Sequence, residues 1–277
     1  MKLRVVELLL VTTVPALFLA ADGFPPIDVA LATLIGGTLA AGAANAFNMV
    51  IESDIDQLMG RTSKRPIVNE QVSEEQALIF AFSISILSLA IFWIWTNPLA
   101  TALTVSAIAF YVFAYTLILK RRTPQNIVWG GIAGCIPVLI GWAAVTNTLA
   151  APAWWFFLLI FFWTPPHFWA LAIKYKDDYA RAGVPMLPVV APMGTVIWQM
   201  WMHATLMVAT SYALLYSLTS PLWAYLATTL VNGYFLGQLA RMRGESKSVE
   251  RAAIKVFHGS ITYLSLISLI LLVLAIL

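Results

Sequence analysis

Nine long apolar runs constrain this chain more than any other feature of its sequence. In residue numbers they span 5–22, 28–51, 74–96, 99–119, 126–146, 153–174, 190–216, 221–240 and 253–276. An α-helix that crosses a bilayer needs about 20 predominantly apolar residues, and isolated strands would leave their backbone groups unsatisfied in lipid. The sequence therefore predicts an all-α membrane protein with about nine transmembrane helices.

The composition agrees with that architecture. Of the 277 residues, 61% are hydrophobic and only 10% are charged, against roughly 25% charged in an ordinary soluble domain. Because the runs and their short connections use nearly the whole length, we expect a single domain over residues 1–277. The net charge of +3 is explained by the basic loops of a membrane protein, so no nucleic-acid partner is implied.

Connections between the runs alternate between two kinds. One kind holds no Lys or Arg and contains Gly23, Pro25 and Pro26, then Asn97 and Pro98, then 146–152, then 219–221. The other kind, together with the N-terminus, holds all sixteen basic residues: Lys2, Arg4, Arg61, Lys64, Arg65, Lys120, Arg121, Arg122, Lys174, Lys176, Arg181, Arg241, Arg243, Lys247, Arg251 and Lys255. Since Lys and Arg collect in cytoplasmic loops, we expect a multi-pass protein of the cell (inner or cytoplasmic) membrane, with its N-terminus cytoplasmic and its C-terminus extracytoplasmic.

The second run ends in a cluster of oxygen-bearing side chains. Asn48, Glu52 and Asp56 are spaced by four residues, and at 3.6 residues per turn each step drifts only about 40° around a helix. One stripe therefore carries three oxygen ligands of the kind that Mg²⁺ prefers. Three basic residues that suit phosphate oxygens follow: Arg61, Lys64 and Arg65. The alternative is a set of ordinary polar residues where a helix leaves the membrane.

A second acidic cluster follows the sixth run, on the same predicted membrane face. Lys174 and Asp178 stand four residues apart, with Lys176 and Asp177 between them. Two such clusters can bracket one diphosphate with metal between them. A charged loop beside the membrane is the alternative.

Three consecutive cations end the fourth run. Lys120, Arg121 and Arg122 come shortly after Tyr115, and cations of this kind bind phosphate groups. An anchor that sets the orientation of the helix explains them equally well.

The three histidines all lie within apolar runs. His167 and His258 fall toward the cytoplasmic ends of the sixth and ninth runs, whereas His203 lies about halfway along the seventh. Imidazole can ligate haem iron or hold a propionate, and it can also join helices by hydrogen bonds. We favour the joining role slightly for His203 and keep both roles open for the other two.

Three stretches carry a family resemblance. They read Asn48-x-x-x-Glu52-x-x-x-Asp56-x-x-Met59-x-Arg61-Thr62-x-x-Arg65-Pro66, then Leu119-Lys120-Arg121-Arg122-Thr123-Pro124 with the later Ile140-Gly141-Trp142, then Pro166-His167-Phe168-Trp169-x-Leu171 followed by Asp178-Tyr179. In these stretches, and over nearly its whole length, the chain resembles the UbiA-type intramembrane prenyltransferases. That family usually carries aspartates at both clusters, whereas Glu52 and Lys174 occupy two of those places here, which fits the branch acting on haem better than the branch acting on quinones.

The resemblance implies transfer of a farnesyl group from farnesyl diphosphate to a vinyl group of haem B, which gives haem O and releases diphosphate. It implies Mg²⁺ as cofactor, with a haem A synthase as a candidate recipient of the product. The implied catalytic set is Asn48, Glu52, Asp56, Asp178 and Lys174, with all of these except Lys174 as metal ligands. The implied diphosphate contacts are Arg61, Lys64, Arg65, Lys120, Arg121 and Tyr115. His167 and His258 are the implied haem contacts.

Two other functions compete with this expectation. A prenyltransferase acting on a quinone precursor or another aromatic acceptor would need nearly the same metal and diphosphate residues. An ion-coupled transporter would also place carboxylates within its membrane helices. Against a transporter, the charges gather at one face instead of near the midplane, and no matching pair of broken helices is evident.

Overall fold

The computed structural model describes residues 3–60, 62–243 and 246–277, and these residues form helices and connections without any strand. The long helical segments are α1 (Leu3–Ala21), α2 (Ile27–Ile51), α4 (Glu74–Trp95), α5 (Pro98–Ala109) continued by the π-helix η1 (Phe110–Leu119) and α6 (Lys120–Arg122), α7 (Asn126–Gly130) followed by α8 (Ile132–Thr146), α9 (Ala151–Lys174), α12 (Met193–Ser217), α13 (Leu222–Leu239) and α14 (Ser246–Ile276). Three short helices lie in the connections: α3 (Ser53–Leu58), α10 (Lys176–Arg181) and α11 (Leu187–Val190). The all-α prediction is confirmed.

Six helical segments of the described chain are long and apolar enough to cross a membrane. They run over Ile27–Ile51, Glu74–Trp95, Pro98–Arg122, Asn126–Thr146, Ala151–Lys174 and Ser248–Ile276. Large apolar side chains also face outward, and Phe24, Ile27 and Leu230 are each more than three quarters exposed. Such a surface is stable against lipid and unfavourable against water, so the protein is a multi-pass membrane protein.

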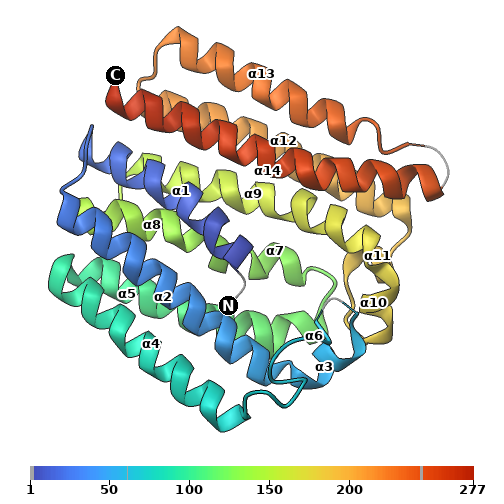
Figure 1. Ribbon diagram of the computed structural model, residues 1–277. Coiled ribbons are helices and arrows are strands. Elements are labelled where there is room, and N and C mark those ends of the chain that lie inside the picture. The colour runs from blue at the N-terminus through green and yellow to red at the C-terminus, as the bar shows by residue number, and fades with distance from the viewer. Residues whose placement is uncertain (1–2, 61, 244–245) are drawn as a thin grey trace.

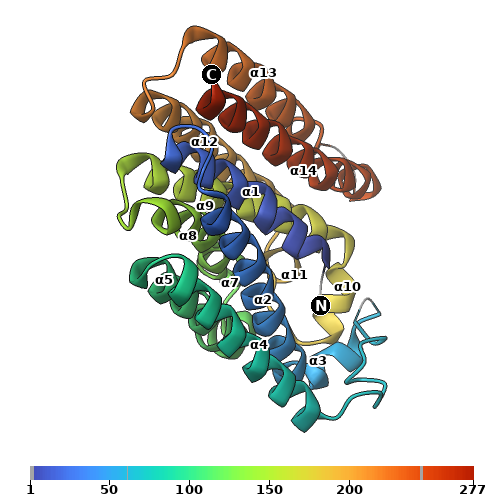
Figure 2. The same cartoon turned by 60° about the vertical axis from the view of Figure 1, so that its left-hand side comes forward.

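The long helices run side by side along a common direction. In Figures 1 and 2, α12, α13 and α14 lie on one side of the bundle, α2, α4 and α5 lie on the other, and α1, α8 and α9 lie between them. Contacts of α9 with α12 and α14, and of α8 with α5, join these groups, whereas α1 packs on α8 and α2 packs on α4 within them. The short helices α3, α6, α10 and α11 gather at one end of the bundle, opposite the C-terminus (Figure 1).

Tight turns close the opposite end. The Asn97 side chain accepts from the backbone N–H of Ala100 at 2.9 Å and so caps α5, while its Nδ2 donates to the carbonyl of Ala143 at 2.6 Å. Asn147, which ends α8, adopts a left-handed conformation with φ of 51°. A residue in this conformation stops a helix and reverses the chain, so few residues close this end.

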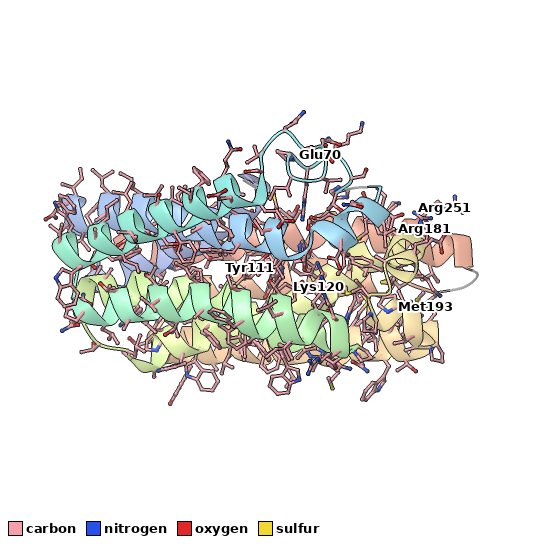
Figure 3. The ribbon with its side chains drawn as sticks, turned by 90° about the horizontal axis from the view of Figure 1, so that it is seen from below. Glu70, Tyr111, Lys120, Arg181, Met193 and Arg251 are labelled. Atoms are coloured by element: carbon pink, nitrogen blue, oxygen red, sulfur yellow. The ribbon has the colours of Figure 1, made fainter. Side chains whose placement is uncertain are left out.

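Charged and polar side chains gather at the end with the short helices. Figure 3 shows the labelled Arg181 and Arg251 at this end, with Lys120 between them and Tyr111 along the bundle. Segregation of the charges to one end agrees with the alternating connections seen in the sequence.

Small residues let α2 and α4 approach closely. A Cβ atom added to Gly36 would lie 2.9 Å from the ring of Phe92, and the carbonyl of Gly36 accepts a hydrogen bond of 2.7 Å from the Ser88 hydroxyl. In lipid, helices associate through such close packing and polar contacts, because burying apolar surface gains little there. The contact holds α2 in place, and α2 leads directly to the site.

Candidate active site

The first arm of the site consists of Asn48, Glu52 and Asp56, at the junction of α2 and α3. Helix α2 ends at Ile51, and Glu52 departs from helical geometry with φ of −103° and ψ of 13°. Hydrogen bonds to the carbonyl four residues back nevertheless continue through the break, from Glu52 N to Asn48 O at 3.0 Å and from Asp56 N to Glu52 O at 2.8 Å. The side chains of the first arm therefore follow one another at helical spacing.

Each residue of the first arm is only 1% exposed, and the two carboxylates are paired with cations from elsewhere in the chain. Lys120 Nζ lies 2.6 Å from Glu52 Oε1, and Arg65 pairs with Asp56. An unpaired charge at such a depth would cost several kcal/mol, on the order of 3–5. Buried Glu52 therefore requires a cation, and Lys120, which directly follows η1, supplies it.

Two opposing effects act on the pKa of the Asp56 carboxyl. Burial raises the pKa of Asp56 above its ordinary value, and this effect outweighs the neighbouring Arg65, which lowers it. Removal from water disfavours the charged form, whereas an adjacent cation favours it. The ionised state of Asp56 thus depends on Arg65 or on another cation in its place.

Arg121 lies beside Lys120 in the sequence but makes a different contact. Its guanidinium forms two hydrogen bonds to Asp54, of 2.8 and 2.9 Å, and a third of 3.2 Å to the carbonyl of Ile51. The Arg121 hydrogen bond lowers the pKa of Asp54. Asp54 and Arg121 also line an open cavity of about 220 Å³ between α3 and the Ala182–Val184 loop. Arg121 therefore lies at the mouth of the site, on the outside of the first arm.

The π-helix η1 brings two tyrosines to the site. The rings of Tyr111 and Tyr115 lie 5.4 Å apart, and the charges of Glu52, Asp56 and Arg65 act on the Tyr111 phenol. Tyr115 packs directly on the backbone of α7, since a Cβ atom on Gly130 would lie 2.2 Å from its Cδ2. Single π-helical turns are rare and frequently occur at functional sites.

The second arm consists of Lys174 and Asp178, which lie at the end of α9 and in α10. Asp178 forms an ion pair with Arg181 in the next turn, and its side chain is 17% exposed. A Cβ atom on Gly60 would lie 3.8 Å from Asp178 Oδ2, so Asp178 faces the loop that follows the first arm. Lys174 is exposed, with its ammonium 5.4 Å from the centre of the Tyr175 ring.

One predicted diphosphate contact, Lys64, lies apart from this geometry. Lys64 is exposed in the loop after α3, and no ion pair links it to a carboxylate within residues 3–60, 62–243 and 246–277. Arg61 lies outside the described residues. Their roles stay predictions.

His167 is enclosed in the interior between α9 and α14. Its ring stacks on Trp163 at 4.3 Å and on Phe257 at 4.7 Å, and its Nδ1 lies 2.6 Å from the hydroxyl of Ser260. Ser260 donates its single proton to the carbonyl of Phe257 at 2.6 Å, so its oxygen accepts from His167. The imidazole is therefore protonated at Nδ1, which leaves the lone pair of a neutral ring on Nε2.

The other two histidines make local contacts. Nδ1 of His258 bonds the carbonyl of Ile254 at 2.9 Å, and Nδ1 of His203 bonds the carbonyl of Gln199 at 2.9 Å. His258 is exposed, while His203 is buried against Phe162 and Trp169. The Nδ1 bond of His203 stays within its own helix, so the hydrogen-bonded link between helices that was favoured for it stays a prediction.

The donor chemistry of the first arm fits a hard divalent cation. Its three side chains offer one amide and two carboxylates, all oxygen ligands of the type that Mg²⁺ selects, and the carboxylates already hold cationic partners. No group of three or more Asp, Glu, His or Cys side chains in the described part of the chain is arranged as a metal site. The arrangement suits a metal that is completed by substrate oxygens and water.

Sequence reasoning missed three participants. Tyr111 and Thr116 lie in the π-helix η1, and Asp54 pairs with Arg121. The four-residue spacing of Tyr111 and Tyr115 was a signal for the first of these. The π-helix itself has no sequence pattern of this kind, because it depends on packing against Gly130 and α2.

The candidate spans, together with buried carboxylates paired to cations at one end, define a multi-pass membrane protein with a charged site. The profile of the UbiA prenyltransferase family matches residues 9–261. The chain therefore belongs to the UbiA prenyltransferase family and is an enzyme that transfers prenyl groups.

Similar proteins support this assignment. A Parafrankia sp. (strain EAN1pec) protein named protoheme IX farnesyltransferase is 51% identical over 268 residues, which cover 96% of this chain and 86% of that one. The apo structure of a UbiA homologue from Aeropyrum pernix K1 superposes with a TM-score of 0.80 at 19% identity, covering 99% of this chain and 98% of that one. A UbiA homologue from Archaeoglobus fulgidus bound to DMAPP and Mg²⁺ gives a TM-score of 0.72 at 15% identity, covering 95% and 97%.

Proposed function

We propose that this enzyme transfers a farnesyl group from farnesyl diphosphate to a vinyl group of haem B, producing haem O and diphosphate. The observation that carries the proposal is the first arm, where three buried oxygen side chains meet Lys120 and Arg65. The choice of haem as acceptor is supported by the names of relatives that are 47–51% identical to the chain.

We propose that Mg²⁺ binds to Asn48, Glu52 and Asp56, with Asp178 approaching from the second arm. Structures of an Archaeoglobus fulgidus homologue with Mg²⁺ and a prenyl diphosphate support the use of this metal in the family. When bound, Mg²⁺ neutralises charge on the diphosphate and makes it a better leaving group.

The cations of the chain hold and stabilise the departing diphosphate. Lys120 and Arg65 can exchange their carboxylate partners for phosphate oxygens when a metal neutralises Glu52 and Asp56. Further proposed contacts are Arg121, at the mouth of the site, together with Lys64, Arg61 and Tyr115. Charge develops on the diphosphate as the allylic C–O bond breaks, and positive groups already in place stabilise it without reorganisation.

Bond formation then uses the electrons of the vinyl group. Its π pair forms the new C–C bond to the farnesyl cation, and water adds to the remaining cation and loses a proton, which gives the hydroxyethylfarnesyl side chain. The apolar, aromatic interior excludes water until this last step. We propose that His167 contacts the haem through Nε2, and that His258 is a second contact nearer the surface.

Pigment analysis tests the reaction. Membranes from cells with and without the expressed chain are extracted, and the haems are separated by chromatography and weighed by mass spectrometry. We expect haem O only when the chain is present. A prenylated aromatic compound would instead indicate a quinone-type acceptor, and the absence of any new product would favour the transporter.

We also propose that the chain crosses the cell membrane nine times as one domain, with its N-terminus in the cytoplasm. The helices α1, α12 and α13 lie alongside the six that are apolar enough to span (Figure 1). Reporter fusions test this topology. At the C-terminus, a reporter that works only outside the cytoplasm should be active, and one that works only in the cytoplasm should be inactive. A cytoplasmic C-terminus would require an even number of spans.

A further inference from the structure

The π-helix η1 is joined to the first arm by a chain of two hydrogen bonds through Thr116. Asn48 Nδ2 donates to Thr116 Oγ1 at 3.2 Å, and Thr116 Oγ1 donates to the carbonyl of Tyr111 at 2.8 Å. Thr116 is completely buried, and Asn48 is 1% exposed. The bond from Asn48 to Thr116 therefore lies away from water, where polar groups contribute most to a defined geometry.

The contact of Thr116 with its own helix is unlike that of other threonines in the bundle. Thr104, in the same continuous segment, donates to the carbonyl of Ala100, four residues back, at 2.8 Å. The hydroxyl of Thr116 instead reaches five residues back, as the π-helical register of Phe110–Leu119 allows. The wider turn thus gives Thr116 a fixed internal acceptor while its oxygen faces α2.

The direction of these bonds decides how the amide of Asn48 is turned. A hydroxyl has one proton, and that of Thr116 is donated to Tyr111, so its oxygen can only accept from Asn48. The amide nitrogen must then face Thr116, and Oδ1 must point away from Thr116. Oδ1 is the only atom of this amide that a hard cation binds.

We propose that Thr116 is a positioning residue for the metal site, which fixes the amide of Asn48 so that Oδ1 is presented to Mg²⁺. The inference rests on the proposed function, because it needs Asn48 to be a metal ligand. Partners that orient a metal ligand typically change metal affinity about 10–100-fold when they are removed. Thr116 is fully buried and accepts a hydrogen bond from Asn48, so its effect on the metal passes through Asn48.

Binding of Mn²⁺ in place of Mg²⁺ tests the inference without turnover. The full chain is purified in lipid nanodiscs with farnesyl thiodiphosphate, an unreactive analogue, and free Mn²⁺ is measured by electron paramagnetic resonance. We expect Thr116→Val to raise the Kd for Mn²⁺ about tenfold, while Thr116→Ser, which keeps the hydroxyl, restores the wild-type value. Thr104→Val is the matched control, since it removes an equally buried hydroxyl, and it should leave the Kd unchanged.

A change at Asn48 separates orientation from simple loss of packing. In an Asn48→Asp background either carboxylate oxygen can face the metal, so adding Thr116→Val should have no further effect on the Kd. A further tenfold loss in that background would overturn the orienting role. Thermal unfolding of Thr116→Val and Thr104→Val, compared side by side, shows whether the two variants are equally folded.

The outcomes distinguish this inference from the proposed function. If Asn48→Ala weakens Mn²⁺ binding but Thr116→Val does not, the positioning role is wrong and the metal assignment stands. If Asn48→Ala also leaves the Kd unchanged, the metal assignment is wrong and the positioning role falls with it.

Discussion

The two arms of the site lie at the same end of the bundle, but the protein surrounds them differently. In the first arm, Glu52 is 1% exposed and is paired with Lys120, which is 68 residues away in the sequence. In the second arm, Asp178 is paired with Arg181 only three residues away, and Lys174 is exposed. Buried partners from distant elements fix a geometry before substrate arrives, whereas local exposed pairs rearrange at little cost. We infer that the first arm is preorganised and that the second adapts.

The largest expected effect is a loss of catalysis, which should be much greater for first-arm variants than for second-arm variants. Glu52→Gln and Asp56→Asn should each abolish haem O formation, by at least about 10²–10³-fold, while the protein remains inserted. Asp178→Asn should leave detectable product. Haem O per unit of membrane protein, measured by chromatography with immunoblotting for the chain, checks both. Normal haem O in both first-arm variants would refute the metal-binding assignment.

The next effect is on stability and compares two adjacent cations. Lys120→Gln removes the partner of buried Glu52 and should lower the free energy of unfolding by about 3 kcal/mol. Arg121→Gln breaks a pair in which Asp54 is 62% exposed, and such pairs contribute at most about 1 kcal/mol. Denaturation followed by circular dichroism in one detergent measures both, and equal losses would contradict the contrast between buried and exposed pairs.

The fit of Tyr115 against α7 tests how rigid the support of the first arm is. Gly130→Ala places a methyl group 2.2 Å from Tyr115 Cδ2 and should cost about 1–3 kcal/mol. Gly134→Ala is the matched control, because nothing lies within 4 Å of its added Cβ, and it should be neutral or slightly stabilising. The unfolding midpoints of the two variants measure this difference. A Gly130→Ala variant as stable as the wild type would show that η1 moves easily to accommodate the methyl group.

The pH dependence of activity tests the pairing of Asp56. Burial raises the pKa of Asp56 and Arg65 lowers it, so Arg65→Gln should raise this pKa further. If the ionised carboxylate is required, the acid limb of kcat/KM moves to higher pH by the same amount. Arg121→Gln should not move it, and an identical profile in Arg65→Gln and the wild type would contradict the coupling.

The smallest effect is expected in the second arm. Lys174→Ala should weaken affinity for farnesyl diphosphate by about fivefold or less, as suits an exposed charge, and should affect haem affinity less. Separate KM values for the two substrates measure this. Equal changes in both would argue for a purely structural role of Lys174.

Much of this architecture could be read from the sequence, because lipid permits few alternatives. The apolar runs predicted the long helices to within about three residues, except that α14 begins at Ser246 and not at 253, and Asn97 with Pro98 marked a turn that the structure contains. The four-residue spacing also placed Asn48, Glu52 and Asp56 in one helical row, although the break at Glu52 was not foreseen.

Partner choice could not be read in this way. Lys120 and Arg121 are adjacent in the sequence, yet one reaches buried Glu52 and the other reaches exposed Asp54. Consecutive residues on a helix point in directions about 100° apart, so the rotation of η1 against α2 decides which cation enters the site. That rotation depends on the π-helical turn and on the close contact of Tyr115 with Gly130.

The sequence by itself determined that this chain is helical, lies in a membrane and carries its charges at one end, because hydrophobic periodicity and solvation are properties of local segments. The tertiary structure alone decided which charges are buried, which cation serves each carboxylate and which way the amide of Asn48 is turned. These features depend on how helices distant in the sequence pack together. A helix rotated by the angle of one residue would bring a different side chain to each partner.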